Sequence, residues 1–142
     1  MCTGRLRTAR SPHFLRWRYL AVPSLTYHAA WHHSGKAAVI LRASRRHGRR
    51  EVMLCEVLLA DGATRALGDL VRALAAEAWA DYLIAHAPWG SPHWWALVRA
   101  RFVPLPRLGP HFTVRPLKPA TAAVGPAQMR RWYLSLGDLE VF

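Results

Sequence analysis

Glu56 stands in the middle of a short apolar stretch, flanked by Cys55 and Val57. Desolvation in such surroundings raises the pKa of a carboxyl group towards neutrality, so Glu56 can serve as a general base that takes a proton from an amine. The structural alternative is an ion pair with an arginine of the first fifty residues, because buried carboxylates are usually paired. Both roles are open from the residues alone.

Tyrosine and histidine side chains supply further groups that can move protons. Tyr82 and Tyr133 are candidate general acids for a leaving group, although strand tyrosines more often pack their rings over a core. His86 and His93 flank a loop that contains Pro and Gly, and they can also transfer protons, with an ordinary surface position as the alternative. These four residues complete the candidates for acid–base chemistry.

Three tryptophans cluster next to His93 in the sequence: Trp89, Trp94 and Trp95. Indole rings stack on planar ligands such as adenine or a nucleic-acid base. They also serve as core or interface residues, because they bury a large apolar area. The cluster therefore indicates either a ligand platform or a packed interior.

The elements that position these groups can be predicted from residues 51–102. Residues 51–59 are almost wholly apolar and contain valines, which favours a short strand covered on both faces, with a buried helix segment as the alternative. After a turn at residues 60–64, apolar side chains recur at helical spacing and predict a helix: Leu67, Leu70, Val71, Leu74 and Ala78. Residues 81–87 form the next predicted strand, and Ser91-Pro92 is typical of a helix start.

A strand, a helix and a second strand of these lengths normally form a right-handed parallel unit. The helix then begins near Thr64 at the C-terminal edge of the sheet, where α/β folds place ligands. Upstream, residues 25–31 and 36–44 are predicted strands of a hairpin, and residues 45–50 form a second tight connection. We therefore predict an α/β (mixed α+β) fold, in which an antiparallel meander precedes a βαβα unit.

The remaining segments divide the chain. Residues 1–11 lack apolar periodicity, and we expect them to be disordered or a remnant, whereas residues 12–142 form a single domain. Within residues 12–19, the large apolar side chains need burial, and Arg16 and Arg18 do not. Two more strands are predicted on either side of a linker rich in Pro, Ala and Gly: residues 111–115 and 131–136.

Net charge is the strongest compositional signal. The 142 residues carry a formal charge of +12, and residues 1–50 contain no acid at all. Such a segment can hold phosphates, anionic lipid or nucleic acid, or it can present solvated arginines without a partner. Only charge and interleaved aromatic residues favour nucleic acid, so a basic nucleic-acid-binding module is a further alternative function, and a nucleic-acid partner is not the first expectation. No apolar run approaches the roughly 18 residues of a membrane-spanning helix.

The two cysteines, Cys2 and Cys55, bear on compartment and on metals. We expect both to be free thiols, which is usual in a reducing cytoplasm, and we therefore expect a cytoplasmic protein. The adjacent pair His32 and His33 has no Cys or acid at ligand spacing, so no metal site is expected.

Three features together resemble a known superfamily. They are the hairpin followed by a βαβα order, the segment Phe14-Leu-Arg-Trp-Arg-Tyr19, and the ending Trp132-Tyr-Leu-Ser-Leu-Gly-Asp-Leu-Glu-Val-Phe142. The chain looks like the C-terminal half of a GNAT-superfamily N-acyltransferase, of the longer bacterial type that ends in Gly-Asp-Leu-Glu-Val-Phe. The resemblance covers most of residues 12–142, and it implies a domain that is incomplete at its N-terminus.

The resemblance implies an acetyltransferase that passes an acyl group from acetyl-CoA, or another acyl-CoA, to an amine acceptor. The cofactor would lie where residues 51–59 and 82–87 splay apart, with Glu56 as candidate base and Tyr82 as candidate acid for the departing thiolate. In the family, pantetheine binds the backbone of the first of these strands, and pyrophosphate binds amides at the start of the next helix. The corresponding residues are Val57, Leu58, Leu59, Gly62, Ala63, Thr64 and Arg65.

Two departures from the family pattern motivate a second hypothesis. The phosphate loop reads Leu59-Ala-Asp-Gly-Ala-Thr64, where the family has Arg or Gln and then small residues, and the first strand and two helices are missing. An incomplete domain leaves one face of its sheet bare, which favours docking. The alternative is therefore a non-catalytic GNAT-like half that docks on a partner domain, in a homodimer or on an upstream polypeptide.

Overall fold

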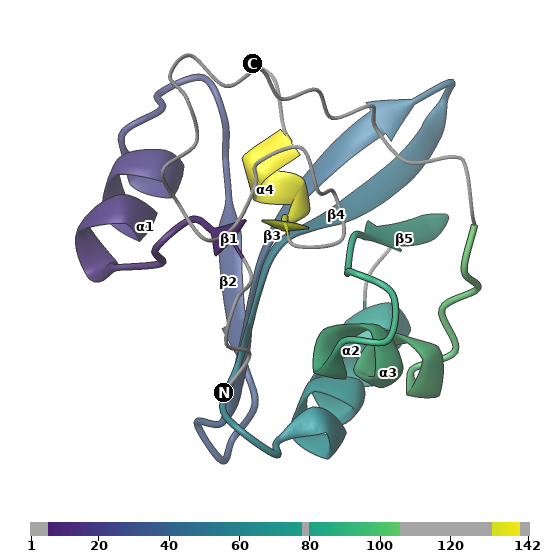
Figure 1. Ribbon diagram of the computed structural model, residues 1–142. Coiled ribbons are helices and arrows are strands. Elements are labelled where there is room, and N and C mark those ends of the chain that lie inside the picture. The colour runs from purple at the N-terminus through teal and green to yellow at the C-terminus, as the bar shows by residue number, and fades with distance from the viewer. Residues whose placement is uncertain (1–5, 78–79, 106–131, 140–142) are drawn as a thin grey trace, which may run out of the picture.

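The computed structural model describes residues 6–77, 80–105 and 132–139 (Figure 1). A four-stranded mixed sheet with the order β2-β3-β4-β5 forms the centre, and a two-stranded sheet pairs β1 with β6. The elements are β1 Leu6–Arg7, α1 Pro12–Leu20, β2 His28–Trp31, β3 Ala37–Arg46, β4 Arg49–Leu59, α2 Thr64–Glu77, β5 Tyr82–Ala85, α3 Pro92–Arg99, β6 Trp132–Tyr133 and α4 Leu136–Leu139. The predicted mixed α/β class is confirmed.

Tight turns produce the antiparallel meander of β2, β3 and β4. Gly35 has a φ of +68° in the first turn, a conformation that L side chains rarely adopt. In the second turn, His47 and Gly48 both have positive φ angles of 49° and 79°. A two-residue hairpin loop of this kind matches the right-handed twist of its strands. Both predicted connections are therefore confirmed.

The β4–α2–β5 unit is parallel, as predicted, with Glu51 opposite Tyr82 and Leu54 opposite Ala85. Figure 1 shows α2 and α3 together on one side of the sheet. The core of this side joins the two helices to β3 and β4, and its central members are fully buried. Burial of one such Leu or Val side chain contributes about 1.5–3 kcal/mol.

A one-residue bulge in β4 decides which way Glu56 faces. Ile40 of β3 pairs with Glu56, whereas its neighbour Leu41 pairs with Leu54, so Cys55 is the extra residue. In a regular strand, Leu54 and Glu56 would lie on the same face. The bulge instead leaves Leu54 in the core against α2 and α3, while Glu56 meets α1 and the segment around α4.

The chain termini differ from the expectation. Leu6–Arg7 forms β1, and Arg10 makes contacts with buried acids, so the described part of residues 1–11 is folded. The predicted strand at residues 131–136 is limited to β6, because Ser135 and Asp138 start the turn of helix α4. Each bonds the other: the Ser135 amide donates to Asp138 Oδ2 at 2.9 Å, and the Asp138 amide donates to Ser135 Oγ at 3.2 Å.

Helix α1 buries Tyr19 as expected, but Trp17 and Arg18 differ from the expectation. Trp17 is 61 % exposed, whereas Arg18 is only 7 % exposed. The reason is a specific partner: Arg18 Nε and Nη2 donate to the Gly137 carbonyl at 3.2 and 2.8 Å. The expected strand at residues 111–115 and the cysteine at position 2 lie outside the described residues, and Cys55 is a buried thiol.

Candidate functional site

Glu56 is 2 % exposed and lies at the centre of a polar network between β4 and both ends of the chain. Its Oε2 accepts from Arg10 Nε at 3.1 Å, and its Oε1 accepts from the Tyr19 hydroxyl at 2.9 Å and from the Ser135 hydroxyl at 3.0 Å. The interpretation that Glu56 pairs with an arginine of the first fifty residues is therefore confirmed. Both carboxylate oxygens are engaged by protein donors, which leaves little capacity to accept an amine proton.

Asp138 is the second carboxylate of the network. It forms an ion pair with Arg10 Nη2 and accepts from the Thr8 hydroxyl at 2.8 Å. Burial by itself raises the pKa of Asp138, but the Ser135 amide, Arg10 and Thr8 outweigh this effect and lower the pKa below its ordinary value. In the same way, the two carboxylates outweigh the desolvation of Arg10 and raise its pKa.

Gly137 allows α4 to approach β4 closely. A Cβ at this position would lie 2.0 Å from the Tyr19 hydroxyl oxygen and 3.0 Å from both the Cys55 carbonyl oxygen and Glu56 Oε1. No side chain fits there without displacement of α4 or Tyr19. The motif Ser135-Leu-Gly-Asp138 therefore works as a docking unit, in which the glycine makes room and the polar residues reach the network.

Sequence reasoning predicted an arginine partner for Glu56 without identifying Arg10, and it missed Tyr19 and Ser135. It also missed Asp138 as the second carboxylate of the network. One signal was available, since Ser-x-x-Asp is a helix-start pattern and Gly next to Asp marks a close approach. Nothing in the sequence indicates that this start binds a residue of β4.

A second group of side chains lies beside the β4 edge, which we define as residues 55–59 on the side of β5. The ladder between the two strands ends at Leu54 and Ala85. Within the part of the chain that the structure describes, no strand pairs with residues 55–59 on this side. A bulged strand whose edge lacks a strand partner can offer N–H and C=O groups to a ligand.

His93 of α3 reaches the β4 edge. Burial lowers the pKa of His93 below its ordinary value, and a hydrogen bond to the backbone of Val57 only partly opposes this shift. His93 Nδ1 also contacts the Tyr133 hydroxyl. A neutral imidazole has one donor and one acceptor nitrogen, so a ring that donates to Val57 can accept the Tyr133 proton.

His86 holds the C-terminal segment at the end of β5. Its Nδ1 lies 2.9 Å from the carbonyl oxygen of Leu134, which can only accept, so Nδ1 carries the proton. Tyr133 contacts His93, Leu134 accepts from His86, and Ser135 donates to Glu56. These three interactions hold three successive residues beside β4.

Tyr82 lies away from these groups. It begins β5 opposite Glu51, five residues before Glu56 along β4. A strand rises about 3.3 Å per residue, so this separation is on the order of 15 Å. Partial desolvation and the Glu51 carboxylate raise the pKa of Tyr82. The structure therefore brings Tyr133, and not Tyr82, to His93.

The seven predicted cofactor-binding residues lie at the end of β4 and around the start of α2. Val57 and Leu59 direct their side chains into the core under α2 and α3, and Leu58 is partly buried. Gly62 has a φ of +73° in the turn before α2, which explains its residue type. At the helix start, Ala63 is buried, Thr64 lines a pocket, and the Arg65 side chain is solvent-exposed.

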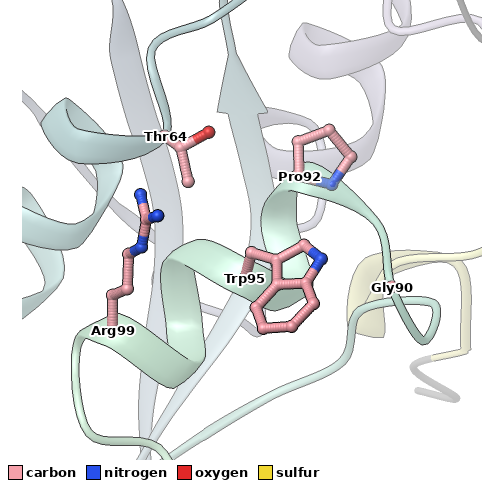
Figure 2. Close-up of a pocket in the computed structure, with 5 residues that line it drawn as sticks. All are labelled: Thr64, Gly90, Pro92, Trp95 and Arg99. Atoms are coloured by element: carbon pink, nitrogen blue, oxygen red, sulfur yellow. The ribbon is translucent and has the colours of Figure 1, made fainter.

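The pocket at the start of α2 is an open cavity of about 460 Å³. It is lined by Thr64, Gly90, Pro92, Trp95 and Arg99. Figure 2 shows Trp95 and Arg99 projecting from α3, with the Arg99 guanidinium pointing towards Thr64. The first amides of a helix lack intrahelical acceptors and carry a partial positive charge, so this end of α2 and Arg99 both favour an anion.

The expected tryptophan cluster is present around α3. Trp94 packs against Trp89 and Trp95, with ring centroids 4.5 and 4.6 Å away. Trp95 is about half exposed at the pocket, so its ring is available for stacking on a planar ligand. Trp94 therefore packs within the cluster, and Trp95 forms part of the pocket wall.

Comparisons with protein-family models, with curated proteins and with solved structures found no match for this chain.

Among residues 6–77, 80–105 and 132–139, no group of three His, Cys, Asp or Glu side chains could hold a metal ion. Within the same residues, no helix combines the length and the apolar character needed to cross a membrane.

Proposed function

We propose that this chain is a GNAT-type N-acyltransferase, which transfers an acyl group from acetyl-CoA or another acyl-CoA to an amine acceptor. The observation that supports it most is the β4 edge. A bulged strand continues beyond the end of its parallel neighbour, and the two groups beside it, His93 and Tyr133, are suited to proton transfer. Backbone amides at such an edge can polarise a thioester carbonyl.

The pocket at the start of α2 is the proposed site for the nucleotide end of the cofactor. Phosphates would bind the amides that begin at Thr64 and the Arg99 guanidinium, and adenine would stack on Trp95. The pocket lies on a different face of α3 from His93, because Pro92, Trp95 and Arg99 share one helix face and His93 is not part of it. A long, flexible cofactor would therefore run around the start of α3 towards the β4 edge.

Proton transfer is assigned to Tyr133 and His93. When the amine attacks the thioester carbonyl, its proton passes to the Tyr133 oxygen while the hydroxyl proton passes to His93. The tetrahedral intermediate then loses the thiolate, which takes a proton back from Tyr133 as His93 returns its own. Burial favours neutral His93 at physiological pH, so the ring is ready to accept. Glu56 acts indirectly by holding Ser135, two residues after Tyr133.

The test is thermal unfolding of the full chain with acetyl-CoA near a millimolar. A ligand that binds only the native state at 100 times its Kd stabilises the protein by about 2.7 kcal/mol, so the Tm should rise by several degrees. Trp95→Ala and Arg99→Gln should weaken this shift. In the matched pair Trp17→Ala and Arg16→Gln, the exposed side chains of α1 are changed and the shift should persist.

Tyr133→Phe and His93→Gln separate chemistry from binding. Both should keep the thermal shift and lose most of the release of free CoA in the presence of an amine, since they remove the proton path and not the pocket. If neither acetyl-CoA nor a longer acyl-CoA shifts the Tm near a millimolar, the acyltransferase proposal is wrong.

A further inference from the structure

The loop end of the β3–β4 hairpin carries a dense cluster of positive charge. Its last two cross-strand pairs are Arg45 opposite Arg50 and Arg46 opposite Arg49, and all four arginines are exposed. Figure 1 shows this end of the two strands projecting beyond the helices. The charge excess of the first fifty residues is thus partly gathered at one protruding tip.

This arrangement is unfavourable for the isolated protein. Like charges directly opposite each other destabilise a strand pair. Among the described residues, none of the four guanidinium groups forms an ion pair with a carboxylate. Two acids close to the hairpin in the fold make other contacts: Asp81 accepts from the Arg50 backbone amide at 2.6 Å, and buried Glu51 accepts from the Ser44 hydroxyl at 3.4 Å. An external polyanion would relieve the repulsion.

The two arginine pairs lie on opposite faces of the ribbon. Successive residues of a strand point to opposite faces, so Arg45 and Arg50 share one face, and Arg46 and Arg49 share the other. The turn between them contains only His47 and Gly48, so the tip has no apolar side chain to insert into a membrane. A flat anionic surface would meet one face only, whereas a groove has phosphates on both walls.

Duplex DNA offers such a groove. The major groove of B-form DNA is about 12 Å wide and admits a two-stranded β-ribbon. The major groove of A-form RNA is too deep and narrow for side-chain contacts of this kind. We propose that the β3–β4 hairpin binds the major groove of duplex DNA, with Arg45 and Arg50 on one phosphate wall and Arg46 and Arg49 on the other. The arginine contacts are to phosphates, so binding depends little on sequence.

The experiment measures fluorescence anisotropy of a labelled DNA duplex of about 20 base pairs, titrated with the full chain at several NaCl concentrations. Four neutralised phosphates predict a slope of log K against log salt of about −3.6, or a loss on the order of 100-fold between about 50 and 200 mM salt. Arg45→Gln/Arg50→Gln and Arg46→Gln/Arg49→Gln should each reduce the slope by about 2. Equal losses of DNA affinity in the two variants would indicate contacts with both walls of the groove.

The matched control is Arg65→Gln/Arg72→Gln, which removes the same charge from the exposed face of α2. It should leave DNA affinity within about twofold, because these arginines lie outside the hairpin. The hairpin variants should keep or raise the wild-type Tm, since they remove repulsion between like charges. Stability thus separates a binding defect from a folding defect.

Four outcomes would overturn the proposal. They are equal losses in the control and hairpin variants, a loss confined to one hairpin face, tighter binding to duplex RNA of the same length, and hairpin-dependent binding to phosphatidylserine vesicles without binding to DNA. Each outcome would indicate a different origin of the binding: total charge, contact with a flat surface, an A-form nucleic acid or a membrane. The thermal shift with acetyl-CoA is measured separately, so either proposal can fail alone.

Discussion

At Glu56, three donors share two buried carboxylate oxygens. Desolvation makes such a group expensive, and its partners offset that cost only while all of them are in place. The Tyr19 hydroxyl illustrates the coupling, because burial and the nearby Glu56 charge raise the pKa of this tyrosine far above its ordinary value. At the scale of the residue, the network depends on close packing as much as on charge.

Gly137→Ala tests that packing. The new Cβ would lie 2.0 Å from the Tyr19 hydroxyl oxygen, so the free energy of unfolding should fall by about 1–3 kcal/mol, the usual cost of overpacking. Urea unfolding measures it. Gly68→Ala is the control, since its Cβ would meet only the Ala96 carbonyl at 3.6 Å in the middle of a helix, where Ala is favoured. Equal stability of the two variants would show that α4 does not pack on Tyr19.

Helices α3 and α4 begin in different ways. Helix α3 has the expected N-cap, in which Ser91 accepts from the Trp94 amide at 3.1 Å and the following proline occupies the first helical turn. Helix α4 starts with Ser135 in a reciprocal bond with Asp138, and the same hydroxyl also donates to Glu56. One element thus carries a local cap, and the other combines its cap with a tertiary contact.

Ser91→Ala and Ser135→Ala separate these two kinds of cap. Loss of a local cap costs about 1 kcal/mol, which is the expectation for Ser91. Ser135→Ala should cost about 2–3 kcal/mol, because it also leaves a buried Glu56 oxygen with one donor fewer. The measurement is again the free energy of unfolding in urea. A smaller loss for Ser135 than for Ser91 would contradict the assigned network.

At the scale of the whole molecule, β4 joins the two ends of the chain. Arg10 from the N-terminal segment and Ser135 from the C-terminal segment both reach Glu56, while α2 and α3 cover the other face of the same strand. Figure 1 shows α4, in yellow, over the middle of the sheet. Stability should therefore respond to the titration of buried groups on both sides of β4.

The free energy of unfolding should depend on pH in two windows. The folded pKa of His93 is depressed, so the unfolded chain binds its proton first, and stability falls as pH drops below about 6.5. Asp138 also has a lowered pKa, and its contribution is present above its ordinary value of 3.8 and lost as pH falls further. Thermal unfolding from neutral to acidic pH measures both windows.

His93→Gln should flatten the first window and leave the second unchanged. His33→Gln is the control, because His33 lies exposed in the first hairpin turn. If the pH dependence just below 6.5 is the same in all three proteins, His93 is not the buried titrating group.

The sequence by itself determined the central elements, because their formation depends on local physical chemistry. Glycines with positive φ set the hairpin turns, Ser91 and its proline start α3, and apolar spacing selects the buried stripe of α2. Each of these signals acts over a few residues. The parallel pairing of β4 with β5 follows from the length of the connecting helix.

Only the tertiary structure decided the partners of Glu56 and placed Tyr133, and not Tyr82, beside His93. Arg10 and Ser135 lie 46 and 79 residues away from Glu56 in sequence, so no local pattern indicates their contacts. The bulge at Cys55 turns Glu56 towards them, and a bulge leaves no trace in apolar periodicity. Orientation and long-range partners depend on how the whole chain packs, because a buried carboxylate is stable only where the fold supplies its donors.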